Sequence, residues 1–171
     1  DLLDVISHRY VAPDGRSKEG LGTRTILYAT LGFEDDTIHL FLNHWPSRSG
    51  GILREEQMRM ELASTVNRLT DSLLTSQGGR VKIIVAGDFN CNPGDETIRL
   101  LTATGKVHGM INLTRRFIDE GIGSYRYQGT WEMLDQVIVS EYFMKAAEGL
   151  YTTKKSARIF SPFFLLSKDP N

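Results

Sequence analysis

The chain has 171 residues, of which 40% are hydrophobic and 24% are charged, and its formal net charge is −1. These values fit one globular domain over residues 1–171 and exclude a disordered or collagen-like chain. The single cysteine, Cys91, excludes a scaffold of internal disulfides. The balanced charge argues against a protein that holds nucleic acid by bulk electrostatics, because such domains carry a basic excess. No apolar run reaches the roughly 18 residues that a membrane span needs.

The hydrophobic pattern predicts strands and helices in an irregular order. In chain order we predict strands at 1–10, 25–30 and 37–43, a helix at 53–76, a strand at 81–86, helices at 95–104 and around 113–118, strands at 124–128 and 133–139, and a tail over 142–166 with a short helix and a strand around 157–160. Some strands follow each other directly, whereas others are separated by helices. This order predicts an α/β domain with a mixed sheet and not a strict βαβ repeat.

Two of these elements have the clearest patterns. The helix at 53–76 carries one apolar stripe, formed by Leu62, Val66, Leu69 and Leu73. Their spacings of four, three and four residues put them on one helix face. The strand at 37–43 is apolar at most of its alternating positions, which predicts burial on both of its faces, or nearly so.

The most informative motif follows the apolar strand at 81–86, where Gly87 leads to Asp88 and, two residues later, to Asn90. Residues two apart in an extended chain point to the same side, and ligands of α/β sheets bind at the carboxyl ends of the strands. A carboxylate accepts a proton from water or holds a metal, and an amide donates to an oxyanion. The alternative is an Asx-type turn without a catalytic role.

Polar side chains also follow the strand at 37–43. His44 is suited to donate a hydrogen bond to a phosphate oxygen or to shuttle a proton, and Arg48 is suited to pair with phosphate in bidentate fashion. A purely structural role is the alternative for His44. We interpret the remaining histidines as structural or solvated: His8, His39 and His108.

A third polar residue, Asp135, interrupts the apolar strand at 133–139. Because a buried carboxylate is costly unless it is paired, we expect a histidine or a backbone donor beside it, or else a purely structural hydrogen bond. Trp45 and Trp131 lie next to these motifs, where they either stack on a substrate group or pack in the core. The other arginines are interpreted as solvated surface: Arg54, Arg59, Arg115, Arg116 and Arg126.

The order of the motifs resembles that of the endonuclease/exonuclease/phosphatase family. A strand ends in Asn-His-x-x-Ser at 43–47, a long helix follows, the next strand ends in Gly-Asp-Phe-Asn at 87–90, and Leu-Asp-x-Val-Ile-Val-Ser begins at Leu134. The resemblance covers roughly residues 23–163. It implies a four-layer α/β/β/α sandwich of two mixed sheets, of which this chain holds a part. It also implies hydrolysis of phosphoesters with Mg²⁺ or Mn²⁺.

The resemblance further implies roles for individual residues. Asp88 would activate or orient the attacking water, Asn90 would help to hold that water and the phosphate oxygens, and His44 would donate to the scissile phosphate. Asp135 would orient a second histidine. Substrate contacts are expected from Asn43, Ser47, Arg48 and Trp131.

Three usual site residues of the family have no match in this sequence: an Asn and the metal-binding Glu of its first strands, and the His of a Ser-Asp-His motif near its end. Glu19 lies in a glycine-rich loop and is a poor match for the Glu, so the metal ligands are unassigned. We expect this stretch alone to bind metal weakly and to be poorly active. We expect the parent protein to be an endonuclease-like phosphodiesterase, with a nucleic acid or another phosphodiester as substrate. The alternatives are a non-catalytic binding domain on the same scaffold and a phosphatase or sphingomyelinase-like phosphoesterase.

Overall fold

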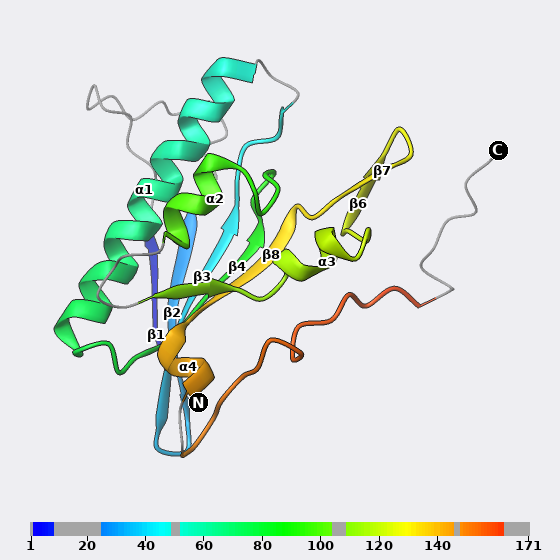
Figure 1. The fold of residues 1–171 in the computed structure, drawn as a ribbon. Helices are drawn as coiled ribbons and strands as arrows, with labels where there is room; N and C mark the ends of the chain where they lie inside the picture. Colours follow the sequence, from blue (N-terminus) through cyan, green and yellow to red (C-terminus); the bar gives the residue numbers. More distant parts are fainter. Residues whose placement is uncertain (1, 9–24, 49–51, 104–108, 146–147, 163–171) are drawn as a thin grey trace.

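The computed structural model describes residues 2–8, 25–48, 52–103, 109–145 and 148–162, and its main feature is a six-stranded mixed sheet (Figure 1). In spatial order the strands are β1 (Leu2–His8), β2 (Ile26–Phe33), β3 (Asp36–His44), β4 (Lys82–Asp88), β8 (Asp135–Ser140) and β5 (Met110–Asn112). Strands β3 and β4 run parallel, and the other neighbouring strands are antiparallel. A separate hairpin pairs β6 (Tyr125–Tyr127) with β7 (Thr130–Glu132).

The described residues form four helices: α1 (Ile52–Ser76), α2 (Glu96–Leu101), α3 (Arg115–Asp119) and α4 (Glu141–Lys145). The long helix α1 ends where Gly78 and Gly79 take positive φ angles of 58° and 77°. The Gly79 amide donates to the carbonyl oxygen of Leu74 at 2.7 Å, as in a glycine C-cap. No helix in the described part of the chain is both long and apolar enough to cross a membrane.

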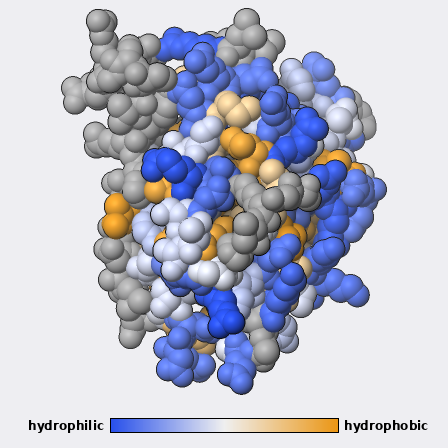
Figure 2. Space-filling model, turned by 60° about the vertical axis from the view of Figure 1, so that its left-hand side comes forward, coloured by the Kyte–Doolittle hydropathy of each residue, from blue (hydrophilic) through white to orange (hydrophobic). Residues whose placement is uncertain are grey.

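Helices α1 and α2 cover one face of the sheet, and the main core lies between them and the strands (Figure 1). The alternation along β3 points His39, Phe41 and Asn43 into this core, where all three are buried. Apolar side chains from every layer complete it, among them Ile26, Leu62, Val66, Ile83, Val85, Ile98 and Ile138. The outward side of α1 is mostly hydrophilic, with small hydrophobic areas between (Figure 2). The inward side of α1 carries the apolar stripe of Leu62, Val66, Leu69 and Leu73, and the burial of this stripe holds α1 on the sheet.

The opposite face of the sheet has a smaller cluster, in which Leu113, Val139 and Phe143 are buried. On β3 the residues that point to this face are less covered, and Leu42 is 41% exposed. The expectation that β3 is buried on both faces therefore holds for one face only within the described residues. The reason is that α1 and α2 cover the first face, whereas the described apolar contacts on the second face come mainly from α4 and parts of the tail.

The predicted α/β class with mixed sheets is confirmed, and the predicted helix at 53–76 and strand at 81–86 match α1 and β4 closely. The strand expected around 157–160 is wrong, because these residues join no strand ladder. Strands β5 and β7 were not predicted, since each has only three residues and too short an alternation to stand out.

Candidate active site

Three of the predicted site residues lie in one row across neighbouring strands. His44 is paired with Asp88 at the carboxyl ends of β3 and β4, and Asp88 is paired with Asp135 at the start of β8. His44 Nε2 lies 3.6 Å from Asp88 Oδ2, and the two side chains are 57% and 34% exposed. Because directly paired residues share a face, the row continues the face of the sheet that lies opposite α1. An imidazole and two carboxylates are thus gathered at an open edge of the sheet.

Gly87 explains how β4 can lie so close to β3 before Asp88. Its φ is +135°, and a Cβ atom added there would lie 1.9 Å from the carbonyl oxygen of Asn43. Any side chain would therefore force the two parallel strands apart. The glycine in the Gly-Asp-Phe-Asn motif is a structural requirement for the pairing of His44 with Asp88.

The Asx-type turn and the site geometry occur together at Asn90. The Asn90 amide N–H donates to Asp88 Oδ1 at 2.9 Å, and Asn90 itself has a φ of +50°, which asparagine tolerates better than most residues. Its side-chain Nδ2 donates to the carbonyl oxygen of Trp45 at 2.9 Å. One Asp88 oxygen is thus held by the turn, and the other is directed at His44.

Asn43 and Trp45 support this edge from inside the core. Trp45 is 1% exposed, its ring packs edge-on against Phe89 at 4.7 Å, and its Nε1 donates to Asn43 Oδ1 at 3.1 Å. Asn43 is 6% exposed, and its Nδ2 donates to the carbonyl oxygen of Phe41. Core packing is therefore the correct alternative for Trp45. The substrate contact expected from Asn43 does not fit its buried position, since the strand alternation turns it towards α1.

Arg48 faces protein groups and not the His44–Asp88 edge. Its Nε donates to the Asn90 carbonyl oxygen at 3.1 Å, its Nη1 donates to Glu132 Oε1 at 2.6 Å, and its Nη2 lies 3.8 Å from Asp95 Oδ2. The phosphate contact expected from Arg48 is at odds with this arrangement, because all three guanidinium nitrogens have protein partners. The tertiary contacts give Arg48 a structural task that its position in the sequence did not indicate.

Arg59 of α1 holds the segment that carries Ser47. Arg59 donates through Nη1 to the carbonyl oxygens of Pro46 and Ser47, at 3.1 and 3.5 Å. Arg59 is 6% exposed, so its interpretation as a solvated surface arginine is wrong. The backbone at Pro46 and Ser47 is therefore held by α1, and Ser47 is partly buried.

Asp135 and Trp131 lie beside a cavity of about 500 Å³. Its walls include Phe117, Trp131, Asp135, Arg158, Ile159 and Phe160. Asp135 is exposed, and its backbone N–H donates to Ser124 Oγ at 3.0 Å. The expectation of a buried Asp135 is wrong, because it is the first residue of β8 and the apolar part of the strand begins after it. Trp131 is 40% exposed, with the Arg126 guanidinium 5.7 Å from its ring.

The residues described here do not make a complete metal site. In the parts of the chain that the structure covers, no three His, Cys, Asp or Glu side chains are placed to hold one ion. His44 and Asp88 are a pair of suitable donors, and Asn90, whose Nδ2 donates to the carbonyl oxygen of Trp45, has only its Oδ1 to add. A bound Mg²⁺ or Mn²⁺ prefers about six oxygen ligands, so this set does not fit the ion by itself.

Cys91, next to Asn90, is not a nucleophile candidate. Its side chain is 3% exposed, and its Sγ lies 3.6 Å from Thr97 Oγ1. Burial raises the pKa of the Cys91 thiol, so the thiol stays protonated.

Sequence reasoning missed Asn92 and Glu132. Asn92 Nδ2 donates to Glu132 Oε1 at 3.1 Å, on the same oxygen that accepts from Arg48. Glu132 is 84 residues from Arg48 and 40 from Asn92. No local pattern signals such contacts, because they depend on how β7 is placed against the loop after β4.

The sequence matches the endonuclease/exonuclease/phosphatase family over residues 1–171. The chain belongs to this family. Its members are hydrolases that include nucleases and phosphatases, and they generally depend on divalent metals. A comparison with curated proteins finds no match.

Solved structures share the family fold with this chain at low sequence identity. The human Nocturnin catalytic domain with bound sulfate has a TM-score of 0.58 at 17% identity, over 82% of this chain and 48% of that one. A mannosyl-6-phosphatase of Bacteroides thetaiotaomicron has a TM-score of 0.57 at 16% identity, over 82% and 53%. Truncated TDP2 of Caenorhabditis elegans has a TM-score of 0.55 at 15% identity, over 82% and 52%. The chain thus spans about half the length of the solved structures that it matches.

Proposed function

We propose that this chain carries the catalytic edge of a phosphodiester hydrolase of the endonuclease-like kind. The observation that supports it best is the row of His44, Asp88 and Asp135, with the imidazole 3.6 Å from the carboxylate of Asp88. Both side chains are open to solvent, so a phosphate and a water can reach them together. A structural ion pair of the same strands would not need this exposure.

The reaction is an in-line attack of water on phosphorus. Asp88 Oδ1 is held by the Asn90 amide, which leaves Oδ2 to orient the water and accept its proton. His44 Nε2 donates to a phosphate oxygen and stabilises the charge that develops there. Asp135 orients a second imidazole, which no described residue supplies. Asn90 acts through its turn, which holds Asp88.

The proposed reaction includes a divalent metal ion, but its full set of ligands is not assigned to residues of this chain. A divalent ion would stabilise negative charge on the phosphate when bound. The donors described above do not complete its coordination, so further ligands would have to come from beyond the described residues. Neither the role of Asp88 nor that of His44 in this proposal passes through the ion.

The cavity beside Asp135 favours a substrate whose phosphate is joined to a planar group. Trp131 offers a half-exposed ring at its wall, and such a ring stacks on a base. A solved structure of Danio rerio TDP2 with a single-strand DNA product also shares this fold, with a TM-score of 0.54. A nucleic acid strand is therefore the phosphodiester that we propose, through Trp131 and the cavity.

The proposal is tested with a panel of substrates in Mg²⁺ or Mn²⁺ and with a chelator. Single-stranded DNA, sphingomyelin, a sugar phosphate and an inositol phosphate are offered to this chain and to a longer polypeptide that contains it. We expect metal-dependent cleavage of the DNA by the longer polypeptide. Preference for the sugar phosphate or the inositol phosphate would establish a phosphatase, and preference for sphingomyelin a lipid phosphodiesterase. No turnover of any substrate, with DNA bound all the same, would establish the non-catalytic binding domain.

A further inference from the structure

We propose that Glu132 is a positioning residue that holds Asp88 and Asp135 in one row. It touches neither of them. Its Oε1 accepts from Arg48 Nη1 at 2.6 Å and from Asn92 Nδ2 at 3.1 Å, so one oxygen joins two separate loops. The effect on rate rests on the function proposed above, whereas the effect on geometry does not.

The first connection runs from Glu132 to Asp88. Glu132 fixes the guanidinium of Arg48, and Arg48 Nε donates to the carbonyl oxygen of Asn90 at 3.1 Å. Asn90 in turn donates its amide N–H to Asp88 Oδ1 at 2.9 Å. Asn90 has a positive φ of 50°, which asparagine tolerates, and both its carbonyl oxygen and its backbone N–H are engaged in hydrogen bonds. Holding its carbonyl thereby fixes the direction of the Asp88 carboxylate.

The second connection runs from Glu132 to Asp135. Glu132 fixes the amide of Asn92, whose Oδ1 accepts from the Met133 backbone N–H at 2.9 Å. Two residues later the chain reaches Asp135. The amide N–H of Phe89 also donates to the carbonyl oxygen of Leu134 at 2.9 Å, so the segment before Asp135 lies against the segment after Asp88. The same Glu132 oxygen therefore sets the position of both carboxylates.

A lone surface ion pair would not accomplish this, because such pairs stabilise little. Here the Glu132 side chain is 20% exposed and the Arg48 side chain is 43% exposed, and the two share a network with Asp95. Asp95 Oδ2 accepts from the Asn92 backbone N–H at 2.8 Å and lies 3.8 Å from Arg48 Nη2. Networks of charged hydrogen bonds fix geometry more firmly than their separate pairs.

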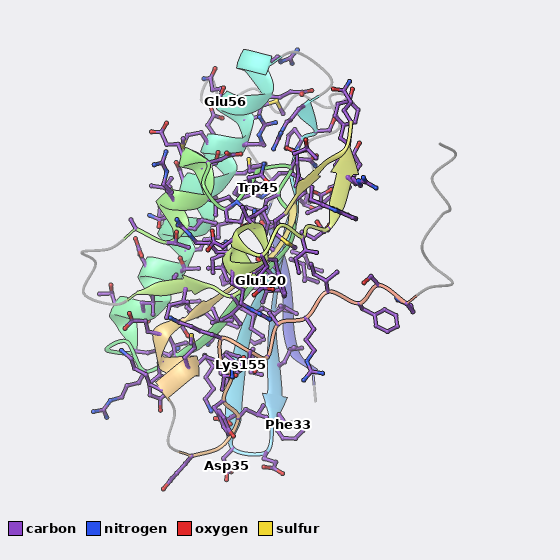
Figure 3. The ribbon with its side chains drawn as sticks, turned by 45° about the vertical axis from the view of Figure 1, so that its right-hand side comes forward. Phe33, Asp35, Trp45, Glu56, Glu120 and Lys155 are labelled. Atoms are coloured by element: carbon purple, nitrogen blue, oxygen red, sulfur yellow. The ribbon has the colours of Figure 1, made fainter. Side chains whose placement is uncertain are left out.

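The test compares Glu132→Ala and Glu132→Gln with Glu120→Ala by nuclear magnetic resonance of the chain. Glu120 directly follows the last residue of α3 (Figure 3) and accepts from Arg116 at 2.9 Å, so its loss removes a carboxylate–arginine pair of the same kind. We expect Glu132→Ala to move the amide signals of Asn90 and Asp135 and the imidazole signals of His44. Glu132→Gln keeps an acceptor for both donors and should return most of these signals to their positions.

The shifts at Asn90 and Asp135 should exceed those of the Glu120 control by about threefold or more, because coupling is confined to residues that share a network. Shifts confined to residues next to 132, or a Glu132→Gln spectrum that stays displaced like that of the alanine variant, would overturn the proposal. Should Glu132→Ala not fold, Glu132→Gln and Arg48→Lys decide the question. Lysine cannot donate to Glu132 and to the Asn90 carbonyl oxygen at the same time in the way that the guanidinium does. Arg48→Lys is therefore expected to move the Asn90 amide signal.

Kinetics of a longer polypeptide with bis(4-nitrophenyl) phosphate supply a second reading. Misplacement of the general base lowers kcat by about tenfold or more and leaves KM within about twofold. A fall in stability with unchanged kcat would mean a merely structural residue. If no variant and no parent shows turnover, the proposed function fails, and the resonance shifts still decide whether Glu132 positions the two carboxylates.

Discussion

Strands β3 and β4 carry a pair of ionisable side chains at each of their two ends, and the two pairs differ in burial and in their protein partners. Asp36 begins β3 and binds Lys82 at the start of β4, whereas His44 ends β3 and faces Asp88 at the end of β4. The first pair lies near the β2–β3 turn that contains Asp35, at the opposite end of the sheet from Trp45 (Figure 3).

The Asp36–Lys82 pair at the β2–β3 turn is largely shielded from solvent, and Asp36 also accepts a hydrogen bond from the backbone. Lys82 is 4% exposed, and the Asp36 carboxylate also accepts from the Leu150 backbone N–H. The hydrogen bond from Lys82, followed by that from Leu150, lowers the pKa of the Asp36 carboxyl. At the other end the side chains of His44 and Asp88 are 57% and 34% exposed, although the Trp45 backbone N–H donates to the Asp88 carbonyl oxygen and holds the two following loops together. Burial and the number of protein partners therefore separate a structural pair from one that is free to act on a ligand.

We expect the largest effect on activity from the loss of Asp88, which belongs to the exposed pair. Asp88→Ala should lower phosphodiester hydrolysis by at least about a hundredfold, because it removes the proposed general base. The same substitution should change the midpoint of thermal unfolding little, since the pair with His44 is exposed. Rates are measured beside Asp88→Asn, which keeps an acceptor for the Asn90 amide. Near-parental turnover of either variant would break the assignment of Asp88.

Loss of Lys82 should lower the stability of the protein and leave its hydrolysis rate unchanged, the reverse of what we expect for Asp88. Lys82→Ala leaves the Asp36 carboxylate without its cation and should lower the unfolding midpoint by about 5 °C or more. Hydrolysis at the distant end should stay near the parental rate under conditions where the variant is folded. Differential scanning calorimetry and the same assay measure the two quantities. Lys145→Ala, which removes an exposed pair with Glu141 at 2.9 Å, is the matched control and should hardly shift the midpoint.

The smallest expected effect concerns His39, which is buried on the same strand between the two pairs. Its Nδ1 lies 2.6 Å from the Tyr28 hydroxyl, and burial lowers the pKa of the imidazole below 6.5. The folded state therefore favours the neutral form, so the stability from His39 is present above pH 6.5 and is lost as the pH falls. The sequence left His39 as either structural or solvated, and its burial fits the structural alternative.

His39→Gln should flatten the dependence of unfolding free energy on pH between about pH 7.5 and pH 5, in the direction that linkage requires. Tyr28→Phe removes the hydroxyl partner but keeps the burial that causes the lowered pKa, so its pH dependence should resemble that of the parent. Chemical denaturation at several pH values measures both. An unchanged slope in His39→Gln would assign the acid sensitivity to other groups.

Much of the fold and part of the candidate site could be predicted from local pattern. The apolar stripe of α1 and the run of β4 are periodic over many residues, so their ends were found to within a residue or two. The polar residues after β3 and β4 stood out because each follows an apolar strand. Strands β5 and β7 were not predicted, and the strand predicted around 157–160 does not form. Segments of three or four residues have too little periodicity for their structure to be predicted from the sequence.

The sequence by itself determined which residues could do chemistry, because residue type and strand ends are local properties. Tertiary structure alone decided which of them face one another. Strand register put His44, Asp88 and Asp135 in a row, and the placement of β7 against the loops brought Glu132 to Arg48, 84 residues away in the sequence. The physical reason is that a hydrogen bond depends on distance in space, and pairing between strands brings distant residues together in a way that no window along the chain records.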